Sequence, residues 1–156
     1  MNDDRRKVLK STGGLAVMGL AVSAGLLRAG SATAADWNKA AFATKNVADT
    51  VKAMGGSGAT ESKDIAIVSP DIAENGAVVP FTINSRLPKT ETIALLVEKN
   101  PNALAASFDI PAGTEAGVTT RVKMGQTSNI TALVKADGKF YYTTKEVKVT
   151  IGGCGG

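Results

Sequence analysis

The sequence predicts a mainly β protein: an immunoglobulin-like antiparallel β-sandwich of about seven strands, preceded by one N-terminal helix. From Lys63 onward, apolar and polar residues alternate over short runs, as expected for strands with one buried face. Turn residues separate these runs at the regular intervals that are typical of sandwiches. Before Lys63, apolar residues instead recur every three or four positions, which indicates a helix.

The helix is expected to begin after Asp36, whose side chain can accept a hydrogen bond from the first turn. It is expected to end at Gly55-Gly56, because glycine commonly terminates helices. The residues between them predict one continuous helix with a single apolar face. The members of that face are Trp37, Ala40, Thr44, Val47, Val51 and Met54.

Seven apolar runs are expected to form strands, each with one face toward a core and the other toward water or a partner. Turn-forming sequences lie between them, among them Asn75-Gly76 and Asp137-Gly138-Lys139. Pro80 is expected on an edge strand or at a bulge, because it cannot donate a ladder hydrogen bond. The strands are expected near residues 64–69, 77–84, 91–99, 103–109, 117–124, 128–136 and 140–151.

The first 34 residues are predicted to be a twin-arginine export signal that is removed. Arg5-Arg6 precede an apolar run from Gly13 to Leu27, and small residues follow at 31–35. This run is shorter than the roughly 20 residues that a membrane-spanning helix needs. An uncleaved N-terminal anchor is the alternative. Residues 35–151 would then form one helix-and-sandwich domain, residues 152–156 a separate arm, and the mature protein would work in the periplasm.

Charge and composition exclude several classes of function. Residues 1–34 hold five basic and two acidic side chains, so they contribute most of the net charge of +4. The remainder, with 13 basic and 12 acidic side chains, has no basic block that would mark a nucleic-acid surface. The chain has no histidine and one cysteine, so no metal site and no cofactor is predicted. A disulfide within the chain is impossible.

The single cysteine stands near the end of the chain, in the sequence Gly152-Gly153-Cys154-Gly155-Gly156. Glycine lacks a Cβ, so this arm is expected to be slim and flexible. Three extended residues beyond Ile151 would carry the thiol about 10 Å from the body. Such an arm suits a group that is presented to several enzymes in turn. From the spacing alone, an intermolecular disulfide through Cys154 is the competing interpretation.

This terminus closely resembles that of the SoxY family, whose carboxy-terminal signature is Gly-Gly-Cys-Gly-Gly. Three internal stretches resemble the same family and follow in the same order along the chain. The resemblance therefore covers essentially the whole mature chain. The stretches are Ile72–Pro80 (IAENGAVVP), Leu96–Pro101 (LVEKNP) and Arg121–Ser128 (RVKMGQTS).

The resemblance implies a substrate carrier rather than an enzyme. Cys154 would be the covalent attachment site, where thiosulfate is held as a cysteine S-thiosulfonate, and Gly152, Gly153, Gly155 and Gly156 would form the flexible arm. A haem-containing enzyme would attach thiosulfate, a manganese-dependent hydrolase would release sulfate, and in some organisms a molybdenum-containing sulfane dehydrogenase would oxidise the sulfur left behind. A SoxZ-like sandwich protein would be the stable partner and would be exported together with this chain.

Two functions of other classes compete with this one. A ubiquitin-like sulfur carrier would use the carboxylate of Gly156, but that chemistry takes place in the cytoplasm and leaves Cys154 without a role. A structural sandwich protein of the periplasm would instead use Cys154 for an intermolecular disulfide. Loss of thiosulfate oxidation in Cys154→Ser would separate the carrier from both.

Other polar residues have plainer explanations. Glu74 is expected to be solvated beside an Asn75-Gly76 turn rather than to act as an acid in a pocket. Three charged residues of the last strand are expected either to solvate its outer face or to border a partner interface, and the sequence leaves both open. They are Lys145, Glu146 and Lys148.

Overall fold

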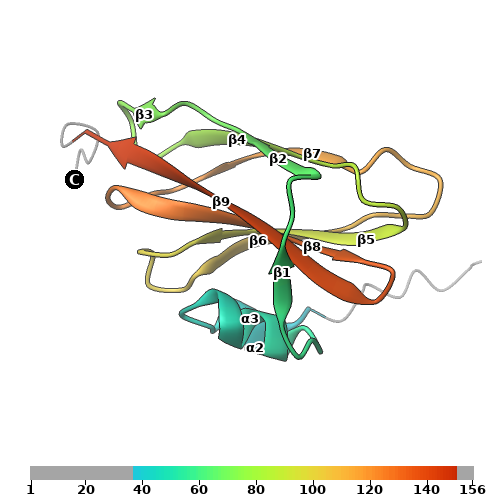
Figure 1. The fold of residues 1–156 in the computed structure, drawn as a ribbon. Coiled ribbons are helices and arrows are strands. Elements are labelled where there is room, and N and C mark those ends of the chain that lie inside the picture. Colours follow the sequence, from blue (N-terminus) through green and yellow to red (C-terminus); the bar gives the residue numbers. More distant parts are fainter. Residues whose placement is uncertain (1–36, 151–156) are drawn as a thin grey trace, which may run out of the picture. The chain divides into compact units, whose positions relative to one another are not determined.

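The computed structural model of the chain describes residues 37–150, and its strands form two sheets that face each other (Figure 1). In the larger sheet the strand order is β1 (Ala59–Glu61), β9 (Lys139–Val149), β8 (Ser128–Ala136), β5 (Thr90–Val97) and β6 (Leu104–Asp109), and β3 (Ile72–Ala73) also pairs with β9. In the smaller sheet the order is β2 (Ile65–Val68), β4 (Val79–Ser85) and β7 (Gly117–Val122).

All seven expected strands are present, and two short strands were missed. β1 and β3 have three and two residues, so they contain too little sequence for a period of two to be visible. Both pair with β9 in the parallel direction, whereas every other pairing in the sandwich is antiparallel. The sandwich is therefore antiparallel, as predicted, except along the outer edge of its last strand.

The main core lies between the two sheets. Phe81 and Ile83 of β4 point into it from the smaller sheet, because alternate residues of a strand share one face. Ile93 and Leu95 of β5 meet them from the larger sheet, together with Ile130 of β8. All five side chains are fully buried, and each contributes on the order of 1.5–3 kcal/mol to folding through the apolar area it removes from water.

The far side of the larger sheet is also buried, because a helical layer covers it (Figure 1). Ala94 and Leu96 of β5 and Leu133 of β8 point to this side and pack with Val51 and Ala41 of the helical segment. The expectation that the second face of each strand meets water or a partner is thus wrong for β5 and β8. Their nearly continuous apolar sequences reflect burial on both faces.

The helical segment is two short helices, α2 (Lys39–Phe42) and α3 (Val47–Ala53), instead of the single helix predicted. Asn46 breaks it: its backbone is extended, and its side chain accepts a hydrogen bond from the amide of Asp49 at 2.8 Å, starting α3. Asn38 caps α2 in the same way, while the expected cap Asp36 lies outside the described residues. Gly55, with φ of +86°, ends the segment as expected.

Pro80 lies in β4, the middle strand of the smaller sheet, rather than on an edge strand or at a bulge. Its register explains why the position is tolerated. The pairing of β2 with β4 stops where Val68 faces Thr82, so Pro80 pairs with Arg121 of β7 and has no partner on the β2 side. The missing N–H therefore costs no ladder hydrogen bond on that side.

Candidate functional site

The predicted site residues Gly152, Gly153, Cys154, Gly155 and Gly156 lie outside the described part of the chain. The structure does describe the base from which they extend, because the described residues include all of β9 and Thr150, the residue after it. We use the term C-terminal root for residues 71–76, 124–127 and 148–150, which surround the last described residue. The geometry of this root fixes where the terminal segment starts.

Both sides of the end of β9 are held by hydrogen bonds from neighbouring segments. On one side, the amide of Lys148 donates to the carbonyl of Asp71 at 2.9 Å, and the amide of Thr150 donates to the carbonyl of Ala73 at 3.1 Å. On the other side, the amide of Val149 donates to the hydroxyl oxygen of Thr127 at 3.0 Å. Three successive backbone amides are thus satisfied right up to the last described residue, which holds the end of β9 in place.

A buried glycine allows the segments of the root to approach one another closely. The carbonyl of Gly76 accepts from the amide of Met124 at 2.7 Å. A Cβ added to Gly76 would lie 2.4 Å from the carbonyl oxygen of Met124 and 2.8 Å from Cγ1 of Val149. No side chain fits between these groups, so glycine is required here for close packing.

The Asn75-Gly76 turn has the predicted form. The side-chain oxygen of Asn75 accepts from the amide of Ala77 at 2.9 Å, which is the local bond that makes asparagine common in turns. Glu74 is exposed, so its predicted solvated role agrees with its position.

Lys145 has a structural role that neither sequence interpretation anticipated. Its Nζ donates to the carbonyl of Ser69 at 2.8 Å and pairs with the carboxylate of Asp71 at 2.9 Å. These contacts tie the loop before β3 to the middle of β9. Glu146 and Lys148 are exposed on the outer face of the strand, and both sequence interpretations stay open for them.

The three internal stretches that resemble the SoxY family meet at this end of the sandwich. The amide of Lys99 donates to the hydroxyl of Ser128 at 3.0 Å, and the side chain of Asn100 donates to the carbonyl of Lys123 at 2.8 Å. The bond between Met124 and Gly76 links the third of these stretches to the first. Residues far apart in the sequence are thus assembled around the end of β9.

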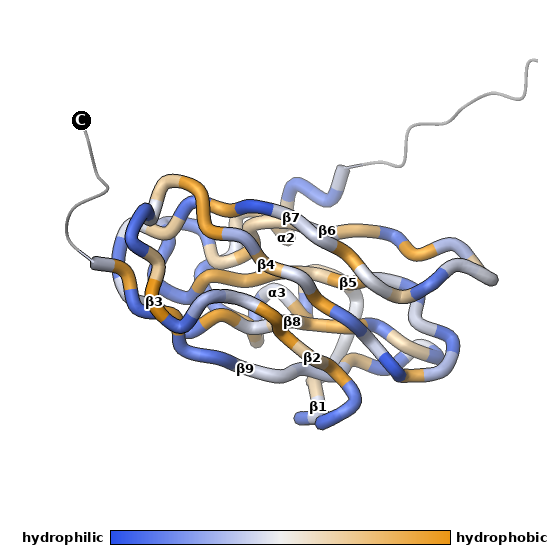
Figure 2. The backbone as a smooth tube through the Cα atoms, turned by 90° about the horizontal axis from the view of Figure 1, so that it is seen from above, coloured by the Kyte–Doolittle hydropathy of each residue, from blue (hydrophilic) through white to orange (hydrophobic). Residues whose placement is uncertain are grey.

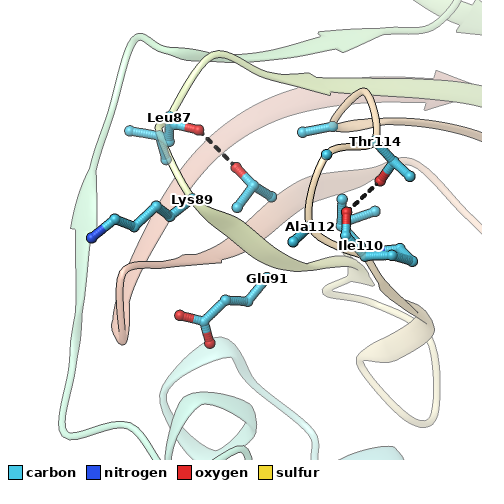
Figure 3. Close-up of a pocket in the computed structure, with 10 residues that line it drawn as sticks. Leu87, Lys89, Glu91, Ile110, Ala112 and Thr114 are labelled. Atoms are coloured by element: carbon cyan, nitrogen blue, oxygen red, sulfur yellow. Dashed lines mark hydrogen bonds between the residues drawn. The ribbon is translucent and has the colours of Figure 1, made fainter.

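A pocket of about 500 Å³ lies at the opposite end of the sandwich (Figure 3). The hydroxyls of Thr90 and Thr114 donate to the backbone carbonyls of Leu87 and Pro111. Glu91 lines this pocket and accepts from the amide of Gly138, at the hairpin where β9 begins.

The length of β9 separates this pocket from the C-terminal root. The strand has 11 residues, which span roughly 36 Å at about 3.3 Å per residue. Four residues beyond Thr150 reach at most about 14 Å, whatever conformation they adopt. The thiol of Cys154 therefore cannot enter the pocket of its own chain.

Electrostatic perturbation is also found at the hairpin end. A hydrogen bond from Lys89 lowers the pKa of Asp137, and a hydrogen bond from Lys135 lowers the pKa of Glu91. All of these side chains are exposed or half-exposed, which is typical of surface ion pairs. Among residues 37–150, no cluster of acidic side chains could hold a metal ion, and no helix is long and apolar enough to span a membrane.

Comparison with known families decides the affiliation of the chain. A family model described as "Sulfur oxidation protein SoxY" matches residues 51–154. The chain belongs to the SoxY family. The solved structure of the sulfur carrier protein SoxY from Chlorobium limicola f thiosulfatophilum is similar, with 37% identity and a TM-score of 0.58, over 66% of this chain and 96% of that one.

SoxY is a sulfur carrier protein and not a catalyst, so the predicted non-enzymatic role within the Sox system is confirmed at that level. A variant of the superoxide reductase (neelaredoxin) from Ignicoccus hospitalis shares the fold with a TM-score of 0.50. At 16% identity, over 64% of this chain and 87% of that one, it shows the fold alone. A search of curated protein sequences found no significant match.

Sequence reasoning located the terminal cysteine but missed the residues that hold its base. Gly76 and Thr127 lie inside two of the stretches that resemble the family, so a signal was present. Their roles depend on contacts with Met124 and Val149, which lie far away in the sequence. Only the folded structure shows these contacts.

Proposed function

We propose that this SoxY chain carries sulfur intermediates of thiosulfate oxidation as covalent adducts of Cys154. The observation that carries the proposal is the family match over residues 51–154, which includes the cysteine. The terminal Gly-Gly-Cys-Gly-Gly sequence gives further support, because glycine on both sides leaves the thiol accessible to large partners.

Loading of the carrier is an oxidation. The thiol of Cys154 and thiosulfate join through a new S–S bond, releasing one proton and two electrons and leaving a cysteine S-thiosulfonate with one negative charge. A haem-containing partner enzyme accepts the electrons. The chain supplies the nucleophile, the thiol of Cys154, and the partner supplies the oxidant.

Unloading is a hydrolysis carried out by a second partner. A manganese-dependent hydrolase adds water across the sulfur–sulfonate bond, which releases sulfate and two protons and leaves a persulfide anion on Cys154. A molybdenum-containing sulfane dehydrogenase oxidises that remaining sulfur in organisms that possess it. The carrier itself keeps its covalent bond to the substrate through these steps.

The C-terminal root supports this role because it gives the arm a fixed origin. Residues 152–156 form the flexible arm, and Thr150 is held by β3 on one side of the strand. A carrier must present one thiol to several enzymes. It benefits when the thiol is confined to a small volume, because a confined group has a high effective concentration near its target.

The working location of the chain is the periplasm, reached by the twin-arginine route, with residues 1–34 removed as the signal. A SoxZ-like sandwich protein forms a heterodimer with it and travels folded with it through the same route. Deleting Arg5 and Arg6 should therefore leave both proteins in the cytoplasm. Finding the partner outside the cytoplasm in that strain would contradict the shared export.

Intact mass spectrometry of the chain, purified from its native host during growth on thiosulfate, tests the proposed function. The expected result is a set of adducts with the masses of sulfur and of thiosulfate, removed by reduction and localised to the peptide that contains Cys154. Cys154→Ser should carry none and should abolish thiosulfate oxidation. A chain that is always unmodified, or linked only to a second copy of itself, would establish the structural disulfide instead.

A further inference from the structure

The described residues expose four large hydrophobic side chains, and two of them lie at the end of the sandwich that contains the C-terminal root. These two are Ile72 (56% exposed) and Val78 (53%); Val68 lies opposite Thr82, midway along β4 of the smaller sheet, and Trp37 precedes α2. An apolar group at one place on a surface is more informative than single exposed residues scattered over it. We call Ile72 and Val78 the apolar patch.

The fold itself places the apolar patch next to the origin of the arm. Ile72 pairs with Lys148 in the parallel register of β3 and β9, two residues before Thr150. Neighbouring strands are about 4.8 Å apart, so Ile72 lies within roughly 10 Å of Thr150. Figure 2 shows the hydrophobic colouring of β3 at the end of the sandwich where β9 finishes.

The other member of the patch follows Ile72 along the chain. Val78 follows the Asn75 turn, whose Gly76 lies against Val149 of β9. The loop before Ile72 is tied to β9 through Lys145, which contacts Ser69 and Asp71. The side chains are thus held on fixed backbone rather than on a free loop.

The length of the arm decides what must cover this patch. Cys154 lies four residues beyond Thr150, so its thiol stays within about 14 Å of the root in any conformation. An enzyme that encloses the thiol in a pocket must bring the lip of that pocket to within the same distance of Thr150. The lip therefore reaches the surface on which Ile72 and Val78 stand.

We propose that the apolar patch is a docking surface for the lip of the enzyme pocket that takes up Cys154. This inference rests on the proposed function. It predicts a partner whose pocket is bordered by uncharged, apolar groups, with charged groups further out. Exposed charges that would form such an outer rim are present here at Asp71, Glu74 and Lys148. An apolar centre with a polar rim is the common anatomy of a protein interface.

The test adds the chain, in complex with its natural partner protein, to periplasmic extract from a strain that lacks this chain. Thiosulfate-dependent reduction of cytochrome c is measured against carrier concentration. In Ile72→Ser/Val78→Ser the half-saturating concentration should rise about ten-fold with little change in the maximal rate. Trp37→Ser removes an even more exposed apolar side chain (68%) just before α2 and should behave as wild type. Iodoacetamide should alkylate Cys154 at the same rate in all three.

Each contrary result has a distinct meaning. A half-saturating concentration of the double variant within two-fold of the wild-type value would overturn the docking surface. Size-exclusion chromatography gives a second refuting outcome: if the double variant no longer forms its complex with the partner protein or with a second copy, the patch is that interface instead. The single variant Ile72→Lys, at an exposed side chain, gives an independent check if the double variant does not fold. Failure of the proposed function looks different, because Cys154→Ser would then still support the reaction.

Discussion

Replacing Gly76 with alanine tests whether the C-terminal root is as closely packed as the structure indicates. The new Cβ would lie 2.4 Å from the carbonyl oxygen of Met124, a backbone atom that cannot rotate away, and 2.8 Å from Cγ1 of Val149. Both distances are far shorter than an ordinary carbon contact of about 3.5–4.0 Å. The backbone around Gly76 or the end of β9 must therefore move by about 1 Å.

Overpacking of this kind costs roughly 1–3 kcal/mol, so we expect the free energy of unfolding to fall by about 2 kcal/mol. For a domain of this size that corresponds to a drop in Tm of roughly 6–12 °C. Urea unfolding followed by circular dichroism measures the change. Gly125→Ala is the matched control, because a Cβ at Gly125 meets nothing within 4 Å and its φ is not in the left-handed region.

The comparison of the two variants decides the matter. If Gly76→Ala and Gly125→Ala unfold with free energies equal to within about 0.5 kcal/mol, the close approach at Gly76 does not exist and the root is looser than described. A loss confined to Gly76→Ala confirms that two family-like segments meet against β9 at this point. Tryptic cleavage near residue 148 should then also become faster in that variant.

Two other perturbations give sharp outcomes. In Thr127→Val the amide of Val149 loses its acceptor, so the free energy of unfolding should fall by about 1 kcal/mol. Thr127→Ser keeps the hydroxyl and should unfold like wild type. Equal losses of unfolding free energy in the two variants would refute the role of this hydrogen bond. At the hairpin, the hydrogen bond from Lys89 holds the pKa of Asp137 below its ordinary value of 3.8. The contribution of this ion pair to stability is therefore fully present above pH 3.8 and is lost as the pH falls through the lower pKa of the folded state. Asp137→Asn, which tolerates the φ of 48°, should therefore show a shallower loss of stability in urea titrations below pH 4, and an unchanged slope would count against the ion pair.

The sequence was sufficient to predict every long strand, because alternating or continuous apolar runs between turn residues indicate strands. It also marked the hairpin correctly, since Asp137 and Gly138 both take the positive φ that such a turn requires. The single-helix prediction was wrong because spacing alone cannot show that Asn46 prefers to cap a new helix. The two parallel strands were missed because they exist only through pairing with a distant strand.

The candidate site was predictable in its chemistry and not in its placement. One cysteine among glycines, together with three internal stretches, was enough to indicate a carrier of the SoxY family. Nothing in the local sequence shows that the segment around Ile72 lies against Lys148, because that contact joins residues far apart in the chain. Contacts of this kind fix both the origin of the arm and the apolar surface beside it.

The two short parallel strands also protect the outer edge of β9. A long unpaired edge can recruit the edge of another molecule and start aggregation. β1 covers residues 140–142 of β9 and β3 covers residues 148–149, so only residues 143–147 stay open on that side. An open stretch of five residues that is flanked on both sides by covered residues offers a poor template for strand addition. Two copies are thereby discouraged from pairing edge to edge along β9.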